Sequence, residues 1–302
     1  MNRINIRFAS KEEGQQLIKN SSYYNRLTQM DIDWRAMKQN ASLAELITVA
    51  QDNVRDFSEA DKDLVIQAVK FIESRLDKFD SQLPLPPEII FVNTTMEDEG
   101  SAGAYTSGNM IVLNQSCIVY PYIEELIAHE LFHCITRHSP EFRQKMYSLI
   151  GFTVMDHDIE LPERIKLVQM ANPDVEHIDN YAEFTINGVK RKCTLITYYT
   201  RSWAEASAQQ GPSTVFFRNV GVALLPLDDL DHPYNIDDAS DFWDKMGSNT
   251  DYIDAAEECL AVNFSMAIVD GPDSIYETPQ LIKSILNAMA RPKFDEARDV
   301  TG

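Results

Sequence analysis

Several features that define common protein classes are scarce in this chain of 302 residues. It has no run of about 18 apolar residues, so no transmembrane helix is expected. The four cysteines are scattered without a C-x-x-C pair, which argues against a disulfide framework and is typical of a reducing compartment. Glycine numbers only 11, and neither G-x-G-x-x-G nor G-x-x-x-x-G-K-[ST] occurs. The common nucleotide-binding fingerprints are therefore missing.

Basic residues are also few, because 27 Lys and Arg stand against 47 Asp and Glu, a formal net charge of −20. Nucleic acids and anionic membrane faces need a basic footprint, so we expect neither as a main partner. Apolar residues make up 44% of the chain, too many for a disordered protein. The first residues lack the apolar core of a secretory signal, so we expect a cytoplasmic location.

Hydrophobic periodicity divides the chain into an N-terminal extension, residues 1–57, and a larger domain over residues 58–302. The extension reads as a series of helical pieces. Ser58 then opens a strong helix, with Asp61 as its capping-box partner. The mixture of helices and a few strands predicts the α+β class. The expected elements are helices over residues 58–79, 121–138, 252–269 and 281–290, and strands over residues 88–92 and 104–115.

The stretch at about 140–250 is expected to be a β-rich insert within the larger domain. Asn187-Gly188 is a strong hairpin signal between two strand-like runs. A further strand is expected over residues 215–225. Asn172-Pro173-Asp174 reads as a turn within the insert, and no chemistry is assigned to it.

One string in the sequence carries chemistry: His129-Glu130-Leu131-Phe132-His133, an H-E-x-x-H motif on the predicted helix 121–138. His129 and His133 lie one turn apart on one face, so both imidazoles can bind one metal ion. Zn²⁺ accepts neutral His nitrogens, and Glu130 can reach the water in the open coordination position as a general base. The plain alternative is a solvated helix on which these three residues are ordinary surface groups.

A third metal ligand must come from elsewhere in the chain. The metzincin spacing fails, because Ser139 occupies the position of its third histidine and His138 lies one residue too early. A carboxylate from the helix 252–269 would complete the His₂Glu set of catalytic zinc sites. Glu258 is favoured over Glu257, because the two side chains point about 100° apart and only one can face the metal.

The motif helix followed by E-x-x-A-x-x-F at Glu258, Ala261 and Phe264 resembles the gluzincin clan of zinc metallopeptidases. More narrowly, it is similar to the branch with E-x-x-A-[DE]-x-F on the glutamate helix, as in anthrax lethal-factor-type domains and small bacterial zincins. The resemblance covers roughly residues 58–138 and 250–270. It implies a zincin-like domain in which an active-site helix and a glutamate helix pack beside a small mixed sheet, with Zn²⁺ as the cofactor.

The chain departs from this pattern at Val262, where such proteins often carry an acidic residue that holds a metal-bound His. Asn263, another side chain or a backbone carbonyl is expected to take over that contact. In gluzincins a tyrosine or histidine often stabilises the oxyanion, which indicates Tyr252 as a catalytic residue beside Glu130. The rival candidates for this role are Tyr198, Tyr199 and His232.

These observations predict a zinc-dependent peptidase in which His129, His133 and Glu258 bind Zn²⁺. Glu130 would take a proton from the zinc-bound water and pass it to the leaving amine. Residues 104–106 resemble the edge strand that binds an extended substrate by β-addition, so the expected partner is a peptide or protein substrate. The alternative is a catalytically weak or inactive zincin-fold protein with a binding or regulatory role, of which Val262 would be a sign.

Overall fold

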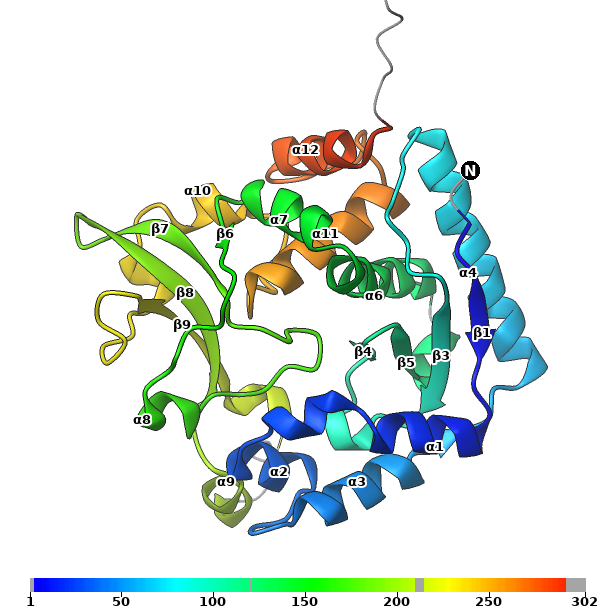
Figure 1. The fold of residues 1–302 in the computed structure, drawn as a ribbon, viewed down its shortest axis with the longest axis horizontal. Helices are drawn as coiled ribbons and strands as arrows, with labels where there is room; N and C mark the ends of the chain where they lie inside the picture. The colour runs from blue at the N-terminus through cyan, green and yellow to red at the C-terminus, as the bar shows by residue number, and fades with distance from the viewer. Residues whose placement is uncertain (1–2, 120, 210–214, 292–302) are drawn as a thin grey trace, which may run out of the picture.

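Two β-sheets organise the structure, a computed structural model that describes residues 3–119, 121–209 and 215–291. The strands are β1 (Ile6–Phe8), β2 (Val54–Arg55), β3 (Ile89–Thr94), β4 (Ala104–Ser107), β5 (Met110–Asn114), β6 (Thr153–Val154), β7 (Asn180–Ile186), β8 (Val189–Tyr199) and β9 (Val220–Pro226). One sheet has the order β1-β3-β5-β4, with β2 also paired to β3, and the other has the order β6-β7-β8-β9. Figure 1 shows the two sheets on opposite sides of the molecule.

Helices fill the space between the sheets and cover the first of them (Figure 1). They are α1 (Lys11–Lys19), α2 (Gln29–Arg35), α3 (Leu43–Asp52), α4 (Glu59–Lys78), α5 (Gln115–Ile118), α6 (Ile123–His138), α7 (Pro140–Ser148), α8 (Glu163–Lys166), α9 (Trp203–Gln209), α10 (Phe242–Met246), α11 (Ala256–Val269) and α12 (Pro279–Met289). The predicted α+β class is confirmed. In the described part of the chain, no helix has both the length and the apolar character needed to cross a membrane.

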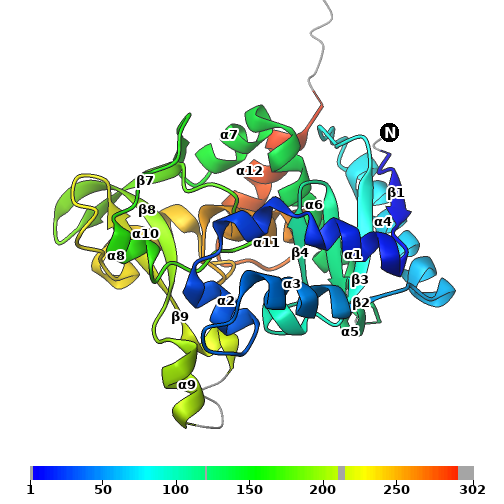
Figure 2. The ribbon, with the colours of Figure 1, turned by 60° about the horizontal axis from the view of Figure 1, so that its bottom comes forward.

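The five-stranded sheet is the middle layer of three. Alternate residues of β3 and β5 face opposite sides, as the strand period requires. Phe91 and Ile111 join the large core beneath α4 and α6, whereas Val92 and Val112 join a second core with residues of α1 and α3. Figure 2 shows α1 and α3 side by side along that second face. The strand segment expected over residues 104–115 is a hairpin of β4 and β5, with Gly108 at a positive φ of 59° in the turn and β4 at the sheet edge.

The first 57 residues contain the predicted helical pieces but also contribute two strands to this sheet. β1 runs parallel to β3, with Ile6 opposite Ile89, and β2 runs antiparallel to it, with Val54 opposite Thr94. The prediction of a helical extension is therefore incomplete. Strands of three and two residues are too short to show the alternation by which a strand is recognised in a sequence.

The insert forms the four-stranded antiparallel sheet. Its central hairpin turns at Asn187-Gly188 as predicted, with φ values of 51° and 79°, and Ile186 pairs with Val189. The expected strand at 215–225 begins later, because residues 216–219 form a 3-10 turn before β9. Asparagine and glycine tolerate the left-handed conformation that the tight turn between β7 and β8 requires.

The packing of α6 against α11 positions the candidate site. Leu131 and Phe132 of α6 and Leu260 and Phe264 of α11 are all almost fully buried. The rings of Phe132 and Phe264 lie 5.2 Å apart between centroids. Burial of each such side chain contributes about 1.5–3 kcal/mol, so this apolar seam holds the two helices at a fixed separation. The polar faces next to the seam must then meet.

Candidate metal centre

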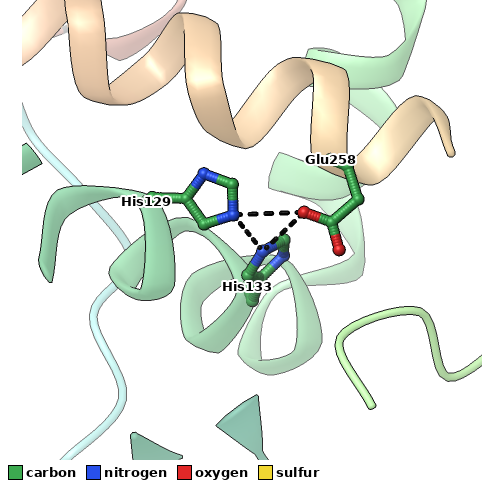
Figure 3. A group of neighbouring side chains, drawn as sticks. All are labelled: His129, His133 and Glu258. Carbon is green, nitrogen blue, oxygen red and sulfur yellow. Dashed lines mark hydrogen bonds and ion pairs between the residues drawn. The ribbon is translucent and has the colours of Figure 1, made fainter. Parts of the chain in front are cut away.

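Three side chains from these two helices converge on one point, as Figure 3 shows. Nε2 of His129 lies 3.1 Å from Oε2 of Glu258 and 3.1 Å from Nε2 of His133. Nε2 of His133 lies 3.5 Å from the same Glu258 oxygen. A zinc ion with bonds of about 2.0–2.2 Å at tetrahedral angles separates its ligand atoms by about 3.3–3.6 Å. One of the three separations lies in this range and the two of 3.1 Å are slightly shorter, so a zinc ion fits after a small outward shift of the side chains. The structure brings together the three ligands predicted from the sequence.

Burial and charge also suit a cation at this point. His133 and Glu258 are almost completely buried, whereas the His129 side chain is 15% exposed toward the cleft. Burial alone would lower the pKa of His133, but the negative charges of Asp174 and Glu258 raise it well above its ordinary value. Burial would raise the pKa of Glu258, but His133 and His129 hold it below its ordinary range. The carboxylates thus favour positive charge here, and a bound metal would replace protons.

Glu257 contacts the other side of His133 and is not one of the three converging ligands. Its Oε1 lies 3.3 Å from Nδ1 of His133 and accepts a hydrogen bond from Thr136, while its Oε2 accepts one from the Tyr147 hydroxyl at 2.6 Å. With Nδ1 donating to Glu257, the lone pair of His133 Nε2 points to the metal position. Glu257 is therefore the carboxylate against His133 that the family-like pattern would place at Val262.

Asn263, one of the substitutes expected for that contact, bonds elsewhere. Its amide nitrogen donates to the carbonyl of Cys259 at 2.8 Å, and its amide oxygen accepts from Asn249 at 2.8 Å. A glutamate next to a ligand glutamate gives no spacing signal of its own. The 100° offset that argued against Glu257 as a ligand is the same geometry that lets it reach the far side of His133.

Two residues of the insert that were predicted to form a plain turn reach the site. Nδ2 of Asn172 donates to Oε1 of Glu258 at 2.6 Å, which leaves the other carboxylate oxygen facing the histidines. Carboxylate oxygens of Asp174 and Glu130 and a ring nitrogen of His133 lie within 4.8 Å of one another. The turn at Asn172-Pro173-Asp174, to which the sequence assigned no chemistry, thus lies against the candidate site. No local pattern links a turn in the insert to a side chain 86 positions away.

Glu130 lies beside the three converging ligands and is only 3% exposed. Among the described residues, none gives its Oε2 a hydrogen bond. Burial and the nearby charge of Asp174 raise its pKa well above the ordinary value. The site opens into a cleft of about 490 Å³ lined by His129, Glu130 and Glu258 together with Ala104 of β4 and the two residues before it. A ligand in this cleft would touch the metal position, the predicted base and β4.

Tyr252 is the predicted oxyanion donor that lies in this cleft. The helix begins at Ala256, so Tyr252 precedes it instead of starting it. Its ring stacks on His129, with centroids 6.2 Å apart and an interplanar angle of 18°. The rivals lie elsewhere: Tyr199 bonds to Asp31 and Arg35 in a buried network, Tyr198 packs on Gly221, and His232 pairs with Asp229 at the surface.

Comparison with known proteins adds no relative. No family model matches the chain, and no curated protein or solved structure matches it significantly. The resemblance to gluzincins stays a prediction, and the function has to be argued from the side chains of the site itself.

Proposed function

We propose that this protein is a zinc-dependent peptidase with a zincin-like domain. The observation that carries the proposal is the triangle of His129, His133 and Glu258, whose ligand atoms are 3.1–3.5 Å apart. Two histidines and a glutamate form the ligand set of catalytic zinc sites that keep an open position. A zinc ion held there would polarise a carbonyl and supply a water with a pKa lowered toward about 7.

Glu130 is the proton carrier in this proposal. Its carboxylate lies in the cleft next to the metal position, with Oε2 unpaired among the described residues. Its pKa lies well above the ordinary value because of burial and the charge of Asp174. A base that must take a proton and then release it works best with a pKa near the working pH. Glu130 would accept the proton of the water and donate it to the leaving nitrogen.

The cleft suits an extended peptide. Ala104 of the edge strand lines it on one side, and Tyr252 lines it near His129. A strand edge binds peptides through backbone hydrogen bonds, without regard to their side chains. A tyrosine hydroxyl stays protonated at neutral pH, so Tyr252 is the candidate donor to the oxyanion.

A peptide library incubated with the zinc-loaded protein tests the proposal, with Glu130→Gln as the control. We expect hydrolysis by the wild type and a loss of about 10²–10⁴-fold in the variant, while both retain zinc. Equal hydrolysis by both proteins would remove Glu130 from the reaction. Zinc in both proteins and hydrolysis by neither would support the alternative, a zincin-fold protein with a binding or regulatory role.

A further inference from the structure

Residues 171–175, between α8 and β7, form a strap that projects from the rest of the insert and contacts β4 (Figure 1). Its first residue is tied to a buried network, because the carbonyl of Ala171 accepts from Arg35 at 2.6 Å and its N–H donates to Asp31 at 3.0 Å. Asn172 bonds to Glu258, as described above. The strap is thus anchored both to this buried network and to the candidate metal centre.

Two arginines fix the rest of the strap. Nη2 of Arg137 donates to the carbonyls of Pro173 and Asp174 at 3.2 and 3.1 Å. Arg26 donates to the carbonyls of Asn172 and Val175 at 3.2 and 2.6 Å. Charge-assisted hydrogen bonds to so many consecutive carbonyls hold a backbone in one place. The strap is therefore a wall of the cleft and not a loosely attached loop.

The wall occupies part of the sheet edge that a peptide would use. Oδ1 of Asp174 accepts from the backbone N–H of Thr106 at 2.7 Å and also from the Thr106 hydroxyl. A carboxylate oxygen thus stands where the carbonyl of an added strand would stand. Ala104 of the same edge lines the open cleft, whereas the carbonyls of Ala102 and Gly103 before it already accept from Asn114. A bound peptide can pair with Ala104 but has to end at Asp174.

The charge of the wall decides which end of a peptide can meet it. The Asp174 side chain is only 9% exposed, and Glu130, with its unpaired Oε2, lies within the same 4.8 Å group. Arg137 is the nearby cation, 3.8 Å from Asp174, and it is shared with Glu176 at 2.9 Å. Beside Asp174 a terminal carboxylate would be repelled, whereas an α-ammonium group would be attracted.

We propose that the strap makes this site selective for a free α-ammonium group, held by Asp174, so that the protein removes one residue at a time from peptide amino termini. Within one residue the amino nitrogen and the carbonyl carbon are only about 2.5 Å apart. An amine at Asp174 therefore places the carbonyl of that same residue beside the metal position. This inference rests on the proposed peptidase function.

The reaction is the hydrolysis of the first peptide bond. The oxygen of water forms a bond to the carbonyl carbon, and the C–N bond breaks. One proton of the water passes through Glu130 to the leaving nitrogen. The products are a free amino acid and a peptide that is one residue shorter, with a new amino terminus. Water is the only co-reactant.

A binding measurement tests recognition of the amine independently of hydrolysis. Two hydrolysis-resistant tripeptides, with a ketomethylene group in place of the first amide, are titrated calorimetrically into the zinc-loaded protein. One has a free amino terminus and the other is acetylated. We expect the free amine to bind at least tenfold more tightly. Asp174→Asn, which keeps an oxygen for Thr106, should abolish the difference, and Glu125→Gln, in the same cleft, should preserve it.

Mass spectrometry of a ten-residue peptide digest supplies the second readout. Stepwise loss of single residues from the free peptide, and none from its acetylated form, is expected. Equal binding of the two tripeptides by the wild type would overturn the amine site without needing any variant. Cleavage at internal bonds of both peptides would also overturn it, but would leave the peptidase proposal standing. Selective binding without any hydrolysis would instead refute the peptidase and keep the amine site.

Discussion

Replacing Glu257 by glutamine tests how the centre controls its second histidine. The change keeps the size of the side chain and removes the charge that faces Nδ1 of His133. It also weakens the bonds from Thr136 and Tyr147, which hold the carboxylate in place. The neutral amide can present its NH₂ group to Nδ1, which would favour the tautomer with the proton on Nε2, the atom that faces the metal.

The expected loss follows from the role of such partners in metal sites. Removing the group that orients a ligand histidine typically weakens metal binding by about 10–100-fold, or roughly 1.4–2.7 kcal/mol. Tyr147→Phe is the matched control, because it deletes a hydrogen bond to Glu257 at 2.6 Å and leaves the carboxylate against His133. That variant should lose about 1.5–3 kcal/mol of folding stability, with a smaller change in zinc affinity.

Zinc affinity is measured by competition with a chromophoric chelator at fixed pH, with folding checked by circular dichroism. We expect Glu257→Gln to lose more zinc affinity than Tyr147→Phe. A folded Glu257→Gln protein with wild-type affinity would refute the reasoning, because Glu257 would then be only a buried carboxylate beside the centre.

Three further outcomes follow from the same contacts. Arg35→Met should lower the urea unfolding free energy by about 3–5 kcal/mol, because it leaves Asp31 and Glu99 buried without their cation; a loss below about 1 kcal/mol would contradict this. Burial and the charge of Glu258 raise the pKa of Asp254 to about 6. That value lies above the ordinary 3.8, so protonated Asp254 contributes to the free energy of unfolding of the zinc-free protein. This contribution is complete below about pH 4 and is lost as pH rises through 6. Asp254→Asn should remove up to about 3 kcal/mol of that pH dependence, and identical pH profiles would argue against it. Chelation of zinc should abolish hydrolysis, and zinc should restore it; activity that survives removal of the metal would exclude a metal-dependent reaction.

The sequence predicted those parts of the site that lie on helices with clear periodicity. His129, Glu130 and His133 share one helix, so their spacing alone fixes their common face. Glu258 needed a second helix and a family-like pattern, and the structure places it 3.1 Å from His129. The capping box at Ser58 and the turn at Asn187-Gly188 were equally local signals, and both are present.

The parts that were missed depend on contacts between segments far apart in the chain. Asp174 meets Thr106 across 68 positions, and Asn172 meets Glu258 across 86. A turn motif predicts the local conformation of the chain but not the distant residues that the turn will contact. β1 was missed for a related reason, because three residues gain strand geometry only through pairing with β3. Tertiary pairing, and not local propensity, decides such segments.

The zinc content per chain, measured by elemental analysis on wild type and Glu258→Ala side by side, tests the central claim most directly. We expect about one zinc per chain in the wild type and much less in the variant, because Glu258 would supply one of three ligand atoms. One zinc in both proteins would keep a metal site but move its third ligand elsewhere. No zinc in the wild type, even after reconstitution, would contradict the account.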